Sequence, residues 1–233
     1  MNNLLILGAG QFGLMVKEIA ESMECFNKID FLDDKSELAI GKLCDYANFS
    51  REYRYAVVAI GNPEIRLLYI QKLEEACFIV AVIASPRSYI SPSSQIMKGS
   101  IIEPMAVVQA NSVVAIGSII SSGAVIRHNA FVGDVCHVDC NTVVMSGSVV
   151  KAKTKVEACT VYRDYPSEAT KTITVKIPSG GPEPVDGLEY KFEDGMLGFF
   201  LCTNIFSKDL LTLFCRSLAE LCFCQCSLSS LLP

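Results

Sequence analysis

Residues 114–131 read VAIGSI-ISSGAV-IRHNAF, three consecutive hexapeptides from a run of twelve between Ile90 and Val161. A strict period of six fits neither a helix, which repeats every 3.6 residues, nor a single strand, which alternates. A parallel β-helix explains it, because each short strand contributes one inward residue before the chain turns a corner. The first residue of every hexapeptide is a β-branched aliphatic: Ile90, Ile96, Ile102, Val108, Val114, Ile120, Ile126, Val132, Val138, Val144, Val150 and Val156.

Three hexapeptides are expected to form one triangular coil, so that residues eighteen apart stack in columns and the run gives four coils. The other positions hold small, polar or Gly residues, as in Ser122-Gly123-Ala124, which suit tight corners. Because a solenoid has exposed ends and flat faces, we expect caps and self-association.

The composition excludes some classes of function. The chain has 233 residues and a net charge of −5 without a basic stripe, which argues against nucleic-acid binding. The apolar start, Met1 to Gly8, lacks a basic segment, so we interpret it as a first strand rather than a signal peptide and expect a cytoplasmic protein. Of the 11 cysteines, those before the C-terminal tail are scattered irregularly, as expected for reduced, buried thiols.

A glycine-rich turn follows the first predicted strand, Leu4 to Leu7. The turn reads Gly8-Ala9-Gly10-Gln11-Phe12-Gly13 and leads into a helical pattern that continues to Met23. Such glycines allow a phosphate to approach the helix N-terminus, where backbone N–H groups favour negative charge. A second strand, Ile29 to Leu32, ends in Asp33-Asp34, at the spacing of a ribose-binding carboxylate.

The rest of this N-terminal part, residues 1–85, continues the alternation of strands and helices. We expect a strand from Tyr55 to Ile60 closed by Gly61, a helix near Glu64 to Ala76, and a strand from Phe78 to Ile83, in a small parallel sheet. The glycines could instead serve only close packing of the first helix on its strand. One mononucleotide-binding half is present, which favours a mononucleotide or nucleotide-sugar over NAD.

The order of these parts resembles the NeuD/PglD-type sugar O- or N-acetyltransferase family over roughly residues 3–150. The resemblance implies an α/β half-Rossmann domain that holds a UDP-sugar, and a left-handed parallel β-helix at 90–161 that holds acetyl-CoA. It also implies a homotrimer with active sites between neighbouring prisms. The candidates for nucleotide contacts are Gly8, Gly10, Gln11, Phe12, Gly13, Asp33, Asp34 and Gly61.

The chain's two histidines lie in the repeats, in the segment from Ile126 to His137. The resemblance makes His128 the general base, with Asn129 beside it, and assigns His137 and Ser146 to acetyl-CoA. A neutral imidazole near pH 7 can accept the proton of an attacking amine or hydroxyl. Without this context, a histidine on a β-helix is as readily a surface residue.

Two features depart from the family. Asn129 stands where the family usually has Glu or Asp, and an amide should leave His128 a weaker base than a carboxylate would. The repeats also end near Val161, before the coils that build much of the acetyl-CoA groove in the family. Lys151, Lys153 and Lys155 could hold the phosphates of CoA there, or form a solvated face.

Residues 162–196 change character and are expected to form an irregular cap. Residues 197–233 form an apolar, Cys-rich tail for which three interpretations remain: a helix packed on its own trimer, an interfacial membrane helix, or a stretch with no selected fold. Cys222, Cys224 and Cys226 match no common zinc spacing, so we expect no metal.

These observations leave three hypotheses. The leading one is an acetyl-CoA-dependent acetyltransferase that acts on a nucleotide-linked sugar by direct attack, without a covalent enzyme intermediate. The second is a nucleotide-sugar-binding paralogue that has lost transfer activity, suggested by Asn129 and the shortened groove. The third, an NAD-dependent oxidoreductase, rests only on the glycine-rich turn and Asp33.

Overall fold

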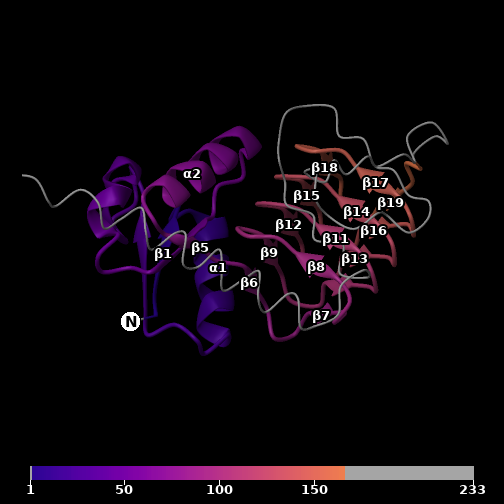
Figure 1. Ribbon diagram of the computed structural model, residues 1–233, viewed down its shortest axis with the longest axis horizontal. Coiled ribbons are helices and arrows are strands. Elements are labelled where there is room, and N and C mark those ends of the chain that lie inside the picture. Colours follow the sequence, from indigo (N-terminus) through magenta and orange to yellow (C-terminus); the bar gives the residue numbers. More distant parts are fainter. Residues whose placement is uncertain (1, 166–233) are drawn as a thin grey trace, which may run out of the picture. The chain divides into compact units, whose positions relative to one another are not determined.

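The computed structural model describes residues 2–165, which form an α/β half followed by a parallel β-helix (Figure 1). The α/β half is built on a parallel sheet in the order β3-β2-β1-β4-β5. Its strands are β1 (Asn3–Leu7), β2 (Lys28–Leu32), β3 (Ala39–Gly41), β4 (Tyr55–Val58) and β5 (Ile79–Val80). Its helices are α1 (Gln11–Ser22), the 3-10 helix η1 (Leu43–Phe49) and α2 (Pro63–Glu75).

The central strand β1 is buried on both sides, which explains why its sequence is apolar from Leu4 to Leu7. Successive side chains of a strand point to opposite faces of the sheet. Leu4 and Ile6 share a buried cluster with residues of α1, whereas Leu5 and Leu7 share one with residues of α2. The two helices therefore cover opposite faces of the sheet.

Two features of this half differ from the expectation. The predicted strand from Phe78 to Ile83 is divided, because β5 joins the α/β sheet while β6 (Ile83–Ala84) joins the first coil of the β-helix. The sheet also has an additional edge strand, β3, followed by η1. Three residues in β3 are too few for a periodic pattern, and η1 has no buried residue that would mark it in the sequence.

The β-helix has three faces, each a sheet of stacked two-residue strands (Figure 1). Partners in neighbouring coils lie eighteen residues apart, as Val107 and Val125 do. The first face consists of β7 (Tyr89–Ile90), β10 (Val107–Val108), β13 (Val125–Ile126), β16 (Val143–Val144) and β19 (Val161–Tyr162). The second face consists of β8 (Gln95–Ile96), β11 (Val113–Val114), β14 (Phe131–Val132) and β17 (Val149–Val150). The third face consists of β6, β9 (Ile101–Ile102), β12 (Ile119–Ile120), β15 (His137–Val138) and β18 (Lys155–Val156).

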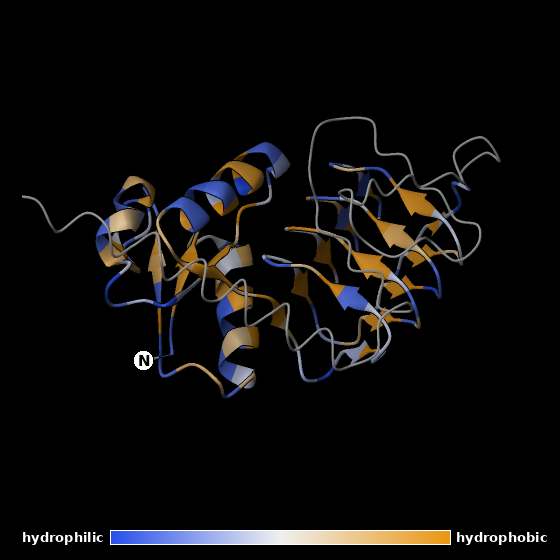
Figure 2. Cartoon of the chain, in the orientation of Figure 1, coloured by the Kyte–Doolittle hydropathy of each residue, from blue (hydrophilic) through white to orange (hydrophobic). Residues whose placement is uncertain are grey.

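The first residues of the hexapeptides fill the interior of the prism. From Ile102 to Val150 they are completely buried and form one cluster. In Figure 2 most of these strands are hydrophobic and several of the corners between them are hydrophilic. The period of six therefore corresponds to one inward side chain per strand.

From Gly99 to Cys159, each corner bends through a left-handed residue three positions after the inward one. Asn111 and Asn129 occupy this position with φ of 56° and 57°, and Gly117 with φ of 65°. Asn and Gly are the residues that adopt this conformation at least cost. The amide at position 129 therefore also suits the backbone of the corner.

Helix α2 lies along one corner of the prism, between the second and third faces. Ile70 packs against Gly117, where an added Cβ would lie 2.6 Å from Ile70 Cδ1, so the helix requires glycine there. Farther along, Arg66 is fully buried and donates hydrogen bonds to the carbonyl oxygens of Gly117 and Val135, at 2.7 and 2.8 Å. The α/β half and the β-helix are thus joined by buried contacts.

Among residues 2–165, no helix is long and apolar enough to cross a membrane. The expected cap beyond Tyr165 and the apolar tail at 197–233 lie outside the described residues.

Candidate functional site

The glycine-rich turn divides into structural and open positions. An added Cβ at Gly8 would lie 2.7 Å from the Ala59 carbonyl oxygen, and one at Gly13 would lie 2.1 Å from the Gly8 carbonyl oxygen. Gly10 and Gly61, by contrast, have nothing within 4 Å of an added Cβ. The first two glycines are therefore needed for packing, and the other two border open space.

The open glycines flank the point where the strand order of the sheet reverses. Gly10 follows β1, and Gly61 follows β4, the neighbour of β1 on the other side from β2. Ligands of open α/β sheets bind at the carboxyl ends of the strands at such a point. Gly10 is also the N-cap of α1, where no side chain caps the helix, so the N–H groups beginning at Gln11 and Phe12 border this opening.

The two candidate ribose-binding carboxylates hold loops. Asp33 Oδ2 accepts a hydrogen bond from the Ala9 N–H at 2.9 Å, and its Oδ1 accepts from the N–H groups of Lys35 and Ser36 at 2.8 and 3.0 Å. These backbone donors, with Ala9 first, lower the pKa of Asp33 below its usual value. Asp34 Oδ1 accepts from the Leu43 N–H at 3.0 Å. Asp33 therefore fixes the glycine-rich turn against the end of β2.

His128 is exposed at the corner between the first and second faces. Its Nδ1 lies 3.2 Å from the side-chain nitrogen of Asn129, and its Nε2 lies 3.0 Å from Ser146 Oγ in the next coil. Its backbone N–H donates to Gln109 Oε1 at 3.1 Å. Both ring nitrogens therefore have a polar neighbour, and the ring has a defined orientation on the surface.

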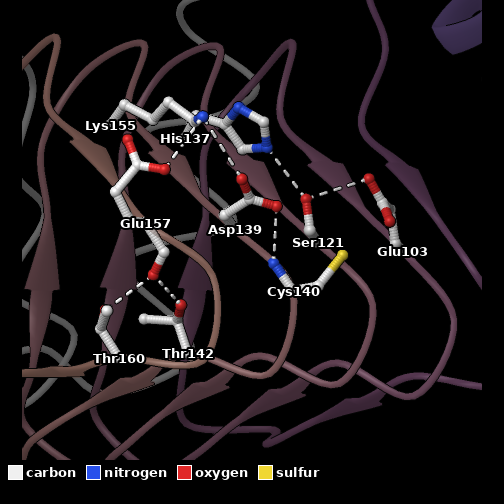
Figure 3. A network of polar contacts seen from close by, with 9 residues as sticks. All are labelled: Glu103, Ser121, His137, Asp139, Cys140, Thr142, Lys155, Glu157 and Thr160. Carbon is white, nitrogen blue, oxygen red and sulfur yellow. Dashed lines mark hydrogen bonds and ion pairs between the residues drawn. The ribbon is translucent and has the colours of Figure 1, made fainter.

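His137 is half-buried on β15 of the third face. Its Nε2 lies 3.0 Å from Ser121 Oγ, and that hydroxyl lies 3.2 Å from Glu103 Oε1 (Figure 3). Burial lowers the pKa of His137, partly opposed by the nearby charge of Asp139. The ring is therefore held in its neutral form around pH 7.

The structure separates the two histidines, because His128 lies at the corner between the first and second faces and His137 lies on the third face. It also pairs Ser146 with His128 rather than with His137. Sequence reasoning missed Glu103 and Ser121, although their spacing of eighteen places them in one column. Once the column was known, a search for polar residues stacked beside each histidine would have found both.

Lys153 and Lys155 of the last coil are engaged with acids. Lys153 pairs with Glu64 at 3.9 Å, and Lys155 pairs with Asp139 and Glu157 at 3.5 and 3.3 Å. In the part of the chain that the structure describes, no group of His, Cys, Asp and Glu side chains is arranged to hold a metal ion.

Residues 3–73 match the family model of the PglD N-terminal domain, and the match covers less than half of the chain. The resemblance to the NeuD/PglD type is thereby confirmed. A comparison with curated protein sequences gave no match.

Solved structures share the fold of this chain. PerB from Caulobacter crescentus in complex with CoA and GDP-perosamine has a TM-score of 0.61 and 20% identity, over 72% of this chain and 92% of PerB. A variant of perosamine N-acetyltransferase from the same organism has a TM-score of 0.62 with the same identity and coverage. The acetyltransferase domain of PglB from Neisseria gonorrhoeae, in complex with acetyl coenzyme A, has a TM-score of 0.55 and 23% identity, over 69% of this chain and 93% of the PglB domain. The predicted fold, an α/β domain followed by a left-handed parallel β-helix, is confirmed.

Proposed function

We propose that this chain is an acetyltransferase that moves the acetyl group of acetyl-CoA to the amine of a nucleotide-linked sugar. The observation that carries the proposal is the exposed His128 ring, oriented through both nitrogens by Asn129 and Ser146 at a corner of the β-helix. The ligands of similar structures, CoA with GDP-perosamine in PerB and acetyl coenzyme A in PglB, support it.

His128 is the proposed base. The amine lone pair attacks the thioester carbonyl carbon, the C–S bond breaks, and CoA leaves as the thiolate. The imidazole takes a proton from the attacking nitrogen and passes it to the thiolate, so no covalent enzyme intermediate is needed. For this step Nε2 must be unprotonated, which requires Nδ1–H to donate to the Asn129 side-chain oxygen. The Asn129 amide can turn its oxygen to the ring, whereas a carboxylate would enforce that arrangement.

The α/β half is the proposed nucleotide site. Gly10 and Gly61 border the open space at the reversal of strand order, and the N-terminus of α1 supplies N–H groups for a diphosphate. We expect a UDP-linked sugar from the family resemblance. PerB was solved with GDP-perosamine, so UDP- and GDP-linked amino sugars belong in the same test.

A homotrimer is the proposed assembly. In one prism His128 lies at the corner between the first and second faces and His137 lies on the third face, so a site that uses both is formed between two copies. The outward residues of the first face include Val107, Val125 and Val143, which are only partly buried in the described residues and are suited to an apolar contact.

The second candidate function is a nucleotide-sugar-binding paralogue without transfer activity, favoured by Asn129 in place of the carboxylate. Mass spectrometry of UDP- and GDP-linked amino sugars, incubated with the protein and acetyl-CoA, separates the two. A product heavier by one acetyl group and absent with His128→Ala supports the transferase. Nucleotide-sugar binding by calorimetry without any product supports the paralogue and refutes the proposal.

A further inference from the structure

Three residues form a polar line from a buried corner to the third face of the β-helix. The Glu103 side chain is nearly buried, at 6% exposure, and its Oε2 accepts hydrogen bonds from the backbone N–H and the hydroxyl of Ser122, both at 2.9 Å. Its other oxygen, Oε1, lies 3.2 Å from the hydroxyl of Ser121, which is 3% exposed. Ser121 in turn lies 3.0 Å from Nε2 of His137. Figure 3 shows Glu103, Ser121 and His137 connected one after another by these contacts.

The chemistry of the groups sets the direction of these hydrogen bonds. A carboxylate only accepts, so the hydroxyl proton of Ser121 points to Glu103. The Ser121 oxygen then accepts from His137, which requires the proton of the neutral imidazole to be on Nε2. Within residues 2–165, Nδ1 of His137 has no hydrogen-bond partner.

We propose that Glu103, acting through Ser121, fixes His137 in its Nε2–H tautomer, so that Nδ1 presents a lone pair to an N–H donor of a bound substrate. Glu103 and Ser121 are positioning residues in this proposal. The tautomer follows from the geometry alone, whereas the substrate contact rests on the proposed acetyltransferase function.

The surroundings of His137 keep the ring neutral. Burial lowers its pKa, and the positive charges of Lys155 and Arg66 act in the same direction, while Asp139 and Glu103 oppose them. Lys155 follows His137 in the next coil and is itself paired with Asp139 and Glu157 (Figure 3). The lone pair on Nδ1 is therefore available at neutral pH.

The same geometry excludes a nucleophilic serine. In a catalytic triad the carboxylate holds the far nitrogen of the histidine, and the near nitrogen takes the proton of the serine. Here the carboxylate lies on the serine, and the serine faces the protonated nitrogen. Ser121 is also too buried to reach a substrate.

The tautomer restricts which group His137 can bind. A thioester carbonyl offers only lone pairs, so it cannot form a hydrogen bond with an unprotonated Nδ1. The amide N–H groups of the pantetheine arm of acetyl-CoA can donate a hydrogen bond to Nδ1, and so can the amine of the acceptor sugar. Steady-state kinetics can show which of these two donors His137 contacts.

The tautomer is tested by nitrogen NMR of protein labelled at histidine, without any substrate. The chain has two histidines, so two rings are expected, and His128→Ala assigns them. We expect the His137 Nε2 signal in the protonated range, the Nδ1 signal in the unprotonated range, and a slowly exchanging Nε2–H. In Glu103→Gln and Ser121→Ala the two shifts should approach each other as the tautomers interconvert, and Nε2–H exchange should accelerate.

Asp139→Asn is the matched control, because it removes a second acid beside His137 that is not connected through Ser121. It should lower the pKa of His137 further and leave the tautomer unchanged. An Nδ1–H tautomer in the native protein would overturn the proposal, as would shifts that are the same in Glu103→Gln, Ser121→Ala and the native protein.

The substrate contact is tested by steady-state kinetics of His137→Ala. A rise in KM of about tenfold for acetyl-CoA alone indicates a pantetheine N–H, and a similar rise for the sugar alone indicates its amine. Unchanged KM for both overturns the substrate contact while the NMR result stands. If no acetyl transfer occurs with the native protein, the proposed function fails, and the NMR experiment still decides the tautomer.

Discussion

Ser146 Oγ lies 3.0 Å from Nε2 of His128, one coil away, while Asn129 stands at the other nitrogen of the ring. A substrate amine that approaches Nε2 takes the place of the serine. The effectiveness of the base therefore depends on which atom of the Asn129 side chain faces Nδ1.

Replacement of Asn129 by Asp should raise the rate. A carboxylate accepts from Nδ1–H, leaves Nε2 unprotonated and stabilises the imidazolium. We expect kcat/KM for acetyl transfer to rise about tenfold. Asn111→Asp is the control, since Asn111 occupies the same left-handed corner position one coil earlier, without a histidine before it. Equal rates in Asn129→Asp and the native enzyme would contradict His128 as the base.

Mixing two impaired variants should restore native kinetics at some sites. His128→Ala lacks the proposed base, His137→Ala lacks the proposed substrate contact, and a site built between two copies can receive one intact ring from each. We expect co-refolded mixtures to contain sites with the native KM, which neither variant has alone. Mixtures that contain mixed oligomers by native mass spectrometry but show only the raised KM of His137→Ala would place both residues in one chain's site.

The glycines of the turn should separate into two classes. Gly13→Ala places a Cβ against the Gly8 carbonyl oxygen and should lower the free energy of unfolding by about 3 kcal/mol. Gly10→Ala points into open space, so it should keep its melting temperature and weaken nucleotide-sugar binding about tenfold. Thermal unfolding and calorimetry measure the two effects. Unchanged affinity in Gly10→Ala would place the nucleotide elsewhere.

Asp33 should make the free energy of unfolding depend on pH in the acid range. Its pKa is lower in the folded than in the unfolded protein, so its stabilising effect is present above the unfolded pKa and is lost as the pH falls through the folded pKa. Asp33→Asn should cost about 1–2 kcal/mol at pH 7, because charged acceptors form the stronger hydrogen bonds. The difference from the native protein should shrink below about pH 4.

Urea unfolding at pH 7 and at lower pH values measures this effect. Glu37→Gln, an exposed acid in the same loop, is the control and should change little. A constant difference between Asp33→Asn and the native protein across the acid range would mean that the carboxylate charge does not hold the turn.

The fold could be predicted because the aliphatic residues repeat every six positions. The contacts of the candidate site could not be predicted, because they join residues in different coils. Every hexapeptide from Ile102 to Val150 carries a buried aliphatic at its first position, and this repeat is visible in the sequence without knowledge of any contact between coils. The Ser121 and Ser146 contacts depend on residues sixteen and eighteen positions away, and no local pattern marks them. The strand β3 was missed because its three residues pair only at a sheet edge.

The buried Arg66 also limits how this protein could be recombined. Its guanidinium donates to the carbonyls of Ile60 and Gly61 beside the open end of the α/β sheet, and to that of Val135, two residues before His137. A chimera that keeps the prism and takes its first half from another protein would leave the carbonyls of Gly117 and Val135 without this donor unless it supplied an arginine at the same place. The two halves should therefore be engineered as one piece.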